Sequence, residues 1–201
     1  MAHALVLICS PNGATSVSRN MLDNYLARRK AKFPDETMTV RDLTLPENAL
    51  PHLSADFITA MFLPPEARTA EQARELELSD QLTAELQSAD TLIVATPIHN
   101  YTVPTTLKAW IDHVARPGVT FTYEGGVRRG LAHARSAVFL LASGGIYTSG
   151  PQAVEDFLAP YLRHMMVFFG IPDVTVLRAE GVAWDAPSAV ARAEAQIAAA
   201  F

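Results

Sequence analysis

Hydroxyl side chains are concentrated in one short stretch near the start of the chain. The stretch SPNGATSVS, residues 10–18, joins an apolar run to an amphipathic one, and its hydroxyls belong to Ser10, Thr15, Ser16 and Ser18. Hydroxyls beside the exposed N–H groups and the positive dipole of a helix N-terminus suit a phosphate group. The alternative is an ordinary serine-rich turn that ends in a helix cap. For this loop taken alone, the ordinary turn is the favoured interpretation.

The patterns that this loop lacks narrow the class of phosphate ligand. It has neither the GxxxxGK[ST] pattern of a nucleoside-triphosphate loop nor the GxGxxG pattern that holds a dinucleotide pyrophosphate. A hydroxyl-rich loop without lysine fits a single terminal phosphate monoester, as on FMN. We therefore expect a mononucleotide.

Planar side chains follow the most convincing apolar run of the chain. The stretch PIHNY, residues 97–101, carries His99, Asn100 and Tyr101. A flat ring such as an isoalloxazine needs an apolar or aromatic wall and hydrogen-bonding groups along its edge, and this stretch offers both. Taken alone, His99 is better interpreted as an exposed loop histidine, and Tyr101 has the alternative of packing over the sheet edge.

Two adjacent glycines mark a third loop of interest. In ASGGIYTSG, residues 142–150, Gly144 and Gly145 permit either close approach of the backbone to a ligand or a tight turn. Together with the other two loops, close approach becomes the stronger interpretation.

Other kinds of catalytic site find no support in the sequence. The six histidines form no HExxH motif and no close pair on a helical face, so we expect no zinc site. No GxSxG motif is present, which argues against a serine hydrolase. Cys9 ends an apolar run and is expected to be inert core rather than a nucleophile.

Alternating apolar runs and helical patterns supply the elements that position these loops. Short apolar runs bounded by turn residues predict strands at 4–9, 37–43, 91–97, 136–143 and 174–181. Helical spacing predicts helices at 18–30, 70–88, 104–115, 151–169 and 186–201. Pro151 opens the fourth of these helices, and Gly170 ends it.

This alternation predicts an α/β fold with helices on both faces of a doubly wound, five-stranded parallel sheet. Five strands suit the order 2-1-3-4-5, in which ligands bind beyond the carboxyl ends of strands 1 and 3, where the winding reverses. The three loops described above all leave carboxyl ends of predicted strands. We therefore expect them to meet.

Length and composition predict one domain over residues 1–201, with insertions at about 44–69 and 117–130. Such insertions usually serve as lids or interface elements, and the alternative is that they have no function of their own. The second insertion carries a Gly-Gly turn. A net charge of −5 argues against nucleic-acid binding. The single cysteine fits a reducing compartment, and no apolar run reaches membrane-spanning length, so we expect a cytoplasmic protein without a membrane anchor.

Along nearly its whole length the chain resembles the FMN-dependent NADH-azoreductase family, flavodoxin-like NAD(P)H:quinone and azo-dye reductases. The matching stretches are LVLICS, SVSRNMLDNYL, TVRDL, PIHNYTVPTTLKAWIDHVARPGVTFTY, SGGIYTSGP, YLRHMMVFFGI and AEGVAW. The fourth of these is long and specific. His99 departs from the family, which often has tyrosine there, and Ser143 stands where an arginine can occur.

The resemblance implies noncovalent FMN and a set of residues that bind it. The residues implied to bind the phosphate are Ser10, Ser16, Val17 and Ser18. The residues implied to contact the isoalloxazine ring are Pro97, Ile98, His99, Asn100, Tyr101, Ala142, Ser143, Gly144 and Gly145. The resemblance further implies a homodimer with active sites at its interface, where the substrate pocket is shaped by Tyr123, Tyr147 and Met165.

The implied activity is two-electron reduction of quinones and azo compounds by NADH or NADPH. Hydride transfer through flavin N5 in a ping-pong cycle is the expected mechanism, because the flavin carries the chemistry. His99 is the one candidate for proton transfer, although shaping the pocket is its favoured role. The alternative is a flavodoxin-like electron carrier or noncatalytic flavin-binding module, against which the lack of a strongly acidic face argues.

Overall fold

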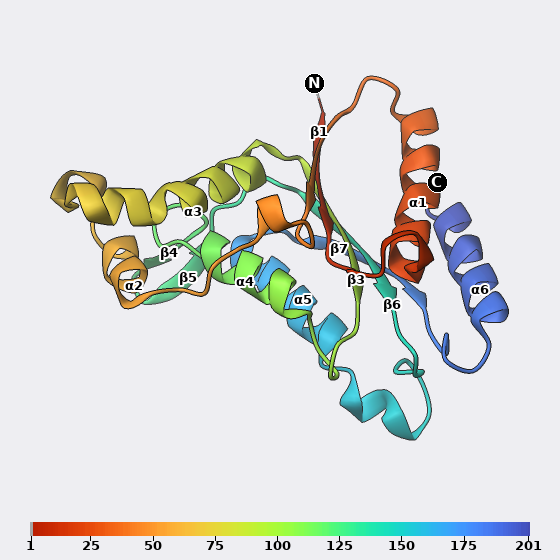
Figure 1. Ribbon diagram of the computed structural model, residues 1–201. Coiled ribbons are helices and arrows are strands. Elements are labelled where there is room, and N and C mark those ends of the chain that lie inside the picture. Colours follow the sequence, from red (N-terminus) through yellow and green to blue (C-terminus); the bar gives the residue numbers. More distant parts are fainter. Residues whose placement is uncertain (1) are drawn as a thin grey trace.

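Five parallel strands form the centre of the protein in the computed structural model, which describes residues 2–201 (Figure 1). The sheet order is β2-β1-β3-β6-β7, and every neighbouring pair is parallel. The strands are β1 (His3–Ile8), β2 (Thr37–Asp42), β3 (Thr91–Pro97), β6 (Ser136–Ala142) and β7 (Asp173–Ala179). Counted within the sheet alone, this is the predicted order 2-1-3-4-5.

Helices cover both faces of the sheet, which is why the strands are apolar without alternation. In β1, Leu5 and Leu7 belong to the core under one set of helices, whereas Ala4 and Val6 belong to the core on the other side. The first set comprises α3 (Ala70–Ser88), α4 (Thr105–Val114) and α5 (Leu158–Phe169), and the second comprises α1 (Val17–Lys32) and α6 (Ala186–Ala199). Within residues 2–201, no helix has the length and apolar character that crossing a membrane requires.

The two predicted insertions form small elements at the edge of this layered core. The first contains two short 3-10 turns, η2 (Pro46–Asn48) and η3 (Pro65–Ala67), and α2 (Ala55–Met61). Phe57 of α2 packs against Leu76 of α3, so a separate small apolar cluster holds this insertion in place.

The second insertion is an antiparallel hairpin of β4 (Phe121–Glu124) and β5 (Val127–Gly130). Its turn residues, Gly125 and Gly126, have φ values of 59° and 81°. This left-handed backbone favours glycine, and the predicted Gly-Gly turn is confirmed.

The helix predicted over 151–169 is wrong in its first part. Pro151–Glu155 forms a 3-10 turn, η4, and α5 begins only at Leu158. The reason is Asp156, whose Oδ1 accepts hydrogen bonds from the N–H groups of Leu158 (3.2 Å) and Ala159 (3.1 Å) and so caps a new helix start. The predicted end is confirmed, because Gly170 closes α5 with φ of 87°.

Candidate functional site

A pocket of about 390 Å³ lies where the carboxyl ends of the central strands meet. The three loops singled out from the sequence all line it, together with the segment that follows β7. Its walls are formed by Ser10, Asn12, Thr15, Ser16, Val17, Ser18, Pro97, Ile98, His99, Ala142, Ser143, Gly144, Val182 and Ala183. The expectation that these loops meet at the switch point of the sheet is confirmed.

The loop before α1 presents hydroxyl groups at a helix N-terminus. Ser16 is the N-cap of α1, and its Oγ accepts from the N–H of Arg19 at 3.3 Å. The Ser16 and Ser18 hydroxyl oxygens lie 3.2 Å apart, and both residues are buried. This arrangement offers an anion two hydroxyls beside the positive end of the helix dipole.

Arg19 anchors this loop to the neighbouring strand. Its Nε donates to the carbonyl of Ser10 at 3.0 Å, and its Nη2 donates to Asp42 Oδ2 (2.7 Å) and to the Thr44 hydroxyl (2.9 Å). Partial burial alone would raise the pKa of Asp42, but hydrogen bonds from Thr44 and Arg19 outweigh it and hold that pKa below its ordinary value. The ion pair therefore keeps its charges in the folded protein and fixes the position of Ser10.

The loop after β3 makes a two-residue hairpin turn whose central residues are not glycine. The N–H and C=O groups of His99 and Thr102 exchange hydrogen bonds of 3.0 and 3.1 Å across the turn. Asn100 and Tyr101 have φ values of 46° and 70°, as a type I′ turn requires. Asparagine tolerates this conformation, but a bulky tyrosine seldom adopts it. Backbone strain of this kind is concentrated at functional sites.

His99 lies between two cavities. It lines the first pocket and also a second one of about 430 Å³, which lies between the 43–52 segment and the start of α4. The second pocket also includes His52 and Cys9. A ligand in either cavity can contact His99. Burial raises the pKa of the Cys9 thiol well above its usual value, which agrees with an inert cysteine.

The glycine loop after β6 is paired to the segment after β7. The carbonyls of Ser143, Gly144 and Gly145 accept from the N–H groups of the 181–183 segment at 3.1, 3.3 and 2.9 Å. Gly144 is exposed, and an added Cβ would meet the Ala183 methyl at an ordinary 3.4 Å. At Gly145 a Cβ would lie only 3.2 Å from the Tyr147 ring, so this glycine makes room for the tyrosine.

Some of the predicted site residues do not line the first pocket. Asn100 and Tyr101 form the tip of their turn, and the Tyr101 ring meets the Tyr147 ring edge-on at 6.2 Å. Tyr123 is 63% exposed on the hairpin, and Met165 packs at the edge of the core from α5. The predicted substrate pocket involves two copies of the chain, so these residues stay predictions.

Sequence reasoning missed the contributions of Asn12, Val182 and Ala183 to the pocket. The last two follow β7, whose carboxyl end lies at the same edge of the sheet as the other loops. The rule that selected the first three loops applies equally to the fifth strand, and Gly181, with φ of 77°, marks the turn there. Among residues 2–201, no three His, Cys, Asp or Glu side chains come together as a metal site.

The chemistry of the pocket fits a phosphate monoester joined to a flat, mainly apolar ring system. Hydroxyls and helix N–H groups lie on one side, and neither a carboxylate nor a cationic side chain is among the lining residues. Pro97, Ile98 and Val182 supply apolar surface on the other sides. These are the features that FMN requires of a noncovalent site.

Comparison with known proteins gives a family and several relatives. A family model described as a flavodoxin-like fold matches residues 2–201. An FMN-dependent NADH:quinone oxidoreductase of Mesorhizobium japonicum is 41% identical over 192 residues, covering 96% of this chain and 90% of the relative. The enzyme of the same name from Beijerinckia indica is 44% identical over 183 residues, covering 90% and 89%.

Solved structures agree with these relatives. An azoreductase of Bacillus anthracis superposes with a TM-score of 0.91 at 27% identity, covering 100% of this chain and 98% of that one. An FMN-dependent NADH-azoreductase of the same species, solved in complex with FMN, gives a TM-score of 0.88 at 25% identity, covering 100% and 97%.

Proposed function

Because the chain belongs to the flavodoxin-like family, we propose that it is an FMN-dependent NADH:quinone oxidoreductase that also reduces azo compounds. The family resemblance predicted from the sequence is confirmed. The observation that carries the proposal is the first pocket, where a hydroxyl-rich helix N-terminus adjoins apolar walls of a size suited to a flavin.

The residues of the chain bind and orient the cofactor. Ser10, Ser16 and Ser18 hold its phosphate with the first N–H groups of α1. FMN held by these residues would supply two-electron redox chemistry between NADH and a quinone or azo compound, with donor and acceptor using one space in turn. We propose that the Asn100 amide, at the tip of its turn, would stabilise negative charge that develops on the flavin.

His99 would shape the space at the boundary of the two cavities. Its position between the two cavities lets it separate the cofactor from a small molecule in the second cavity. A proton-transfer role would require the imidazole to reach the reacting atoms of the acceptor. Replacing His99 by Tyr or Gln distinguishes the roles, because loss of a proton donor changes the pH dependence of kcat and a change of shape alters KM.

The active form is proposed to be a cytoplasmic homodimer whose substrate pocket includes Tyr123, Tyr147 and Met165. Support comes from large apolar side chains exposed near these residues. Tyr123 and Val127 of the hairpin are 63% and 69% exposed, and Val167 of α5 is 61% exposed. Large exposed apolar side chains are often found at protein interfaces.

Purification and a simple assay test the proposal. The protein should be yellow, and acid precipitation should release FMN rather than FAD. NADH oxidation should depend on menadione or methyl red, and a parallel run with NADPH gives the donor preference. A colourless protein that FMN neither binds nor stabilises against heating would refute the cofactor assignment. A protein that binds FMN but oxidises NADH only with an added reductase would be an electron carrier.

A further inference from the structure

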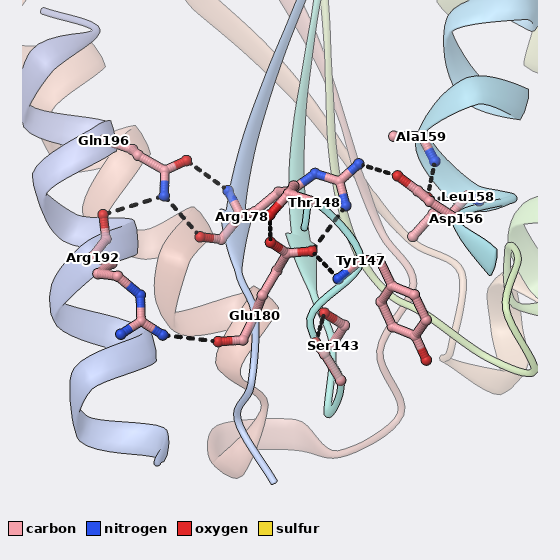
Figure 2. A network of polar contacts seen from close by, with 11 residues as sticks. Ser143, Tyr147, Thr148, Asp156, Leu158, Ala159, Arg178, Glu180, Arg192 and Gln196 are labelled. Carbon is pink, nitrogen blue, oxygen red and sulfur yellow. Dashed lines mark hydrogen bonds and ion pairs between the residues drawn. The ribbon is translucent and has the colours of Figure 1, made fainter. Parts of the chain in front are cut away.

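Three charged side chains form a cluster at the end of β7, next to the glycine loop (Figure 2). Arg178 Nη2 lies 2.6 Å from Asp156 Oδ2, and its Nη1 lies 3.3 Å from Glu180 Oε1. All three side chains are only 12–15% exposed. We call these residues the Arg178 cluster. One guanidinium thus joins two carboxylates in a partly buried position.

Glu180 holds the far end of the glycine loop. Its Oε1 accepts from the N–H of Tyr147 at 2.9 Å, and its Oε2 accepts from the Thr148 hydroxyl at 2.5 Å. The nearer end, at Ser143–Gly145, is already paired to the 181–183 segment. The pocket wall and the residues that follow it are therefore fixed from one stretch of chain, residues 180–183.

Asp156 fixes the other end of the segment that joins β6 to α5. Residues 149–154 within this segment are exposed, and Asp156 caps α5 while its second oxygen binds Arg178. Positions 178 and 180 lie two residues apart, so their side chains project from the same face of an extended chain. The start of α5 and the glycine loop are thereby tied to each other through one ion cluster.

We propose that Glu180 is a positioning residue for the flavin site, acting through Tyr147 and Thr148, with Arg178 orienting its carboxylate. This inference rests on the proposed function. The cluster lies outside the apolar cores on both sheet faces, and α5 has its own cap in Asp156. What Glu180 alone adds is the placement of the loop whose Ser143 and Gly144 line the pocket.

The test compares Glu180→Ala with Glu180→Gln in the full-length protein. Glutamine can accept from the Tyr147 N–H through its carbonyl and donate to the Thr148 oxygen, whereas alanine can do neither. The FMN dissociation constant is measured by quenching of flavin fluorescence, and the circular dichroism of the bound flavin reports its surroundings. We expect about tenfold weaker binding and an altered flavin spectrum for Glu180→Ala, and recovery to within about threefold for Glu180→Gln. Glu194→Ala, an exposed glutamate on α6, is the matched control and should bind FMN as the wild type does.

Equal FMN affinity and identical flavin spectra in Glu180→Ala and wild type would overturn the inference and leave the proposed function intact. Wild-type protein that does not bind FMN would instead overturn the proposed function itself. If Glu180→Ala does not fold, Thr148→Val replaces it, since this change removes a single hydrogen bond at an exposed residue. About threefold weaker FMN binding is then expected, and unchanged affinity would overturn the inference.

Discussion

The two loops on either side of the pocket are held by opposite means. The loop at residues 10–18 is fixed mainly by nearby residues, through the Ser16 cap and the bond from Arg19 to the Ser10 carbonyl, while Arg19 itself pairs with Asp42 of β2. The glycine loop at 142–150 is fixed by residues more than thirty positions later, Glu180 and the 181–183 segment. A binding pocket can thus combine a locally determined side with one that exists only after the whole sheet has formed.

The same two loops also differ in which backbone groups remain for a ligand. In the 10–18 loop the carbonyls of Ser10, Asn12 and Gly13 all accept bonds from within the loop or from Arg19. The Thr15 and Ser16 N–H groups donate two of these bonds, so it is the N–H groups at the start of α1, at Val17 and Ser18, that can turn to an anion. The glycine loop uses the carbonyls of Ser143–Gly145 and the Tyr147 N–H in hydrogen bonds to residues 180–183. The first loop keeps backbone groups available for a ligand, whereas the second uses its backbone groups to hold one wall of the pocket in position.

Removing the Arg19 side chain should have the largest effect on stability and on FMN affinity. Arg19→Ala frees the Ser10 carbonyl and leaves Asp42 partly buried without its cation. We expect the free energy of unfolding to fall by about 2 kcal/mol. FMN affinity should fall by about 30-fold as the loop loses its position. Urea denaturation and flavin titration measure the two effects.

The control for this change is Arg28→Ala, an exposed arginine on the same helix that bonds Asn24. Arg19→Lys should give an intermediate result, because lysine keeps the charge but cannot serve several acceptors in fixed directions. Normal FMN affinity in Arg19→Ala would show that the loop holds its shape without an anchor, and the contrast between the loops would be lost.

Two serines in the 10–18 loop separate stability from binding. Ser16→Ala removes a helix cap and should lower the free energy of unfolding by about 1 kcal/mol. Ser18→Ala removes a buried hydroxyl whose hydrogen bond is to Ser16 and should lower the free energy of unfolding by about 0.5 kcal/mol. Both should weaken FMN binding by about tenfold if both hydroxyls contact the phosphate. Unaltered FMN affinity in both variants would show that the phosphate does not lie there.

Acid should weaken the Arg19 anchor specifically. The pKa of Asp42 is lower in the folded protein than in the unfolded chain. Its contribution to stability is therefore complete above the unfolded value, near 3.9, and is lost as pH falls through the folded value. Denaturation midpoints measured between pH 5 and pH 2 should drop less steeply in Asp42→Asn than in wild type. Parallel pH profiles for the two proteins would contradict the assignment.

Most of the fold could be predicted because its signals are local and repeat. Apolar runs such as 91–97 and glycine turns such as 125–126 specify strands and hairpins from neighbouring residues alone. Handedness and sheet order then follow from the few topologies that parallel strands allow. The predicted start of α5 is too early because Pro151 and Asp156 are both residues typical of helix starts. The sequence alone does not distinguish between these two positions.

The site was predictable to the extent that it is local. Ser16 and Ser18 lie at a helix start that the sequence itself marks. Glu180 and Arg178 could not be identified in this way. A single Glu or Arg at a strand end forms no sequence motif, and its partners at residues 147–156 come close only in the folded protein. The distinction is the same as that between the two loops. Short-range anchoring is visible in the sequence, whereas long-range anchoring is not.

The turn at His99–Thr102 can be compared with the two loops. Changes there are expected to alter the free energy of unfolding least. It closes on itself through two backbone bonds, and Tyr101 sits at φ of 70° without glycine. Asparagine adopts this conformation readily, whereas a β-branched residue does not. Tyr101→Asn should therefore keep the free energy of unfolding within about 0.5 kcal/mol of wild type, and Tyr101→Val should lower it by about 1 kcal/mol relative to Tyr101→Asn.

Flavin binding by these two variants distinguishes a role of the Tyr101 ring from a role of the turn backbone. If the tyrosine ring matters, both should bind FMN or reduce quinone less well than wild type, despite their different stabilities. If only the backbone of the turn matters, Tyr101→Asn should keep wild-type activity while Tyr101→Val loses it. Equal stability of the two variants would mean that the turn relaxes freely, and the strained backbone at Tyr101 would then carry no functional meaning.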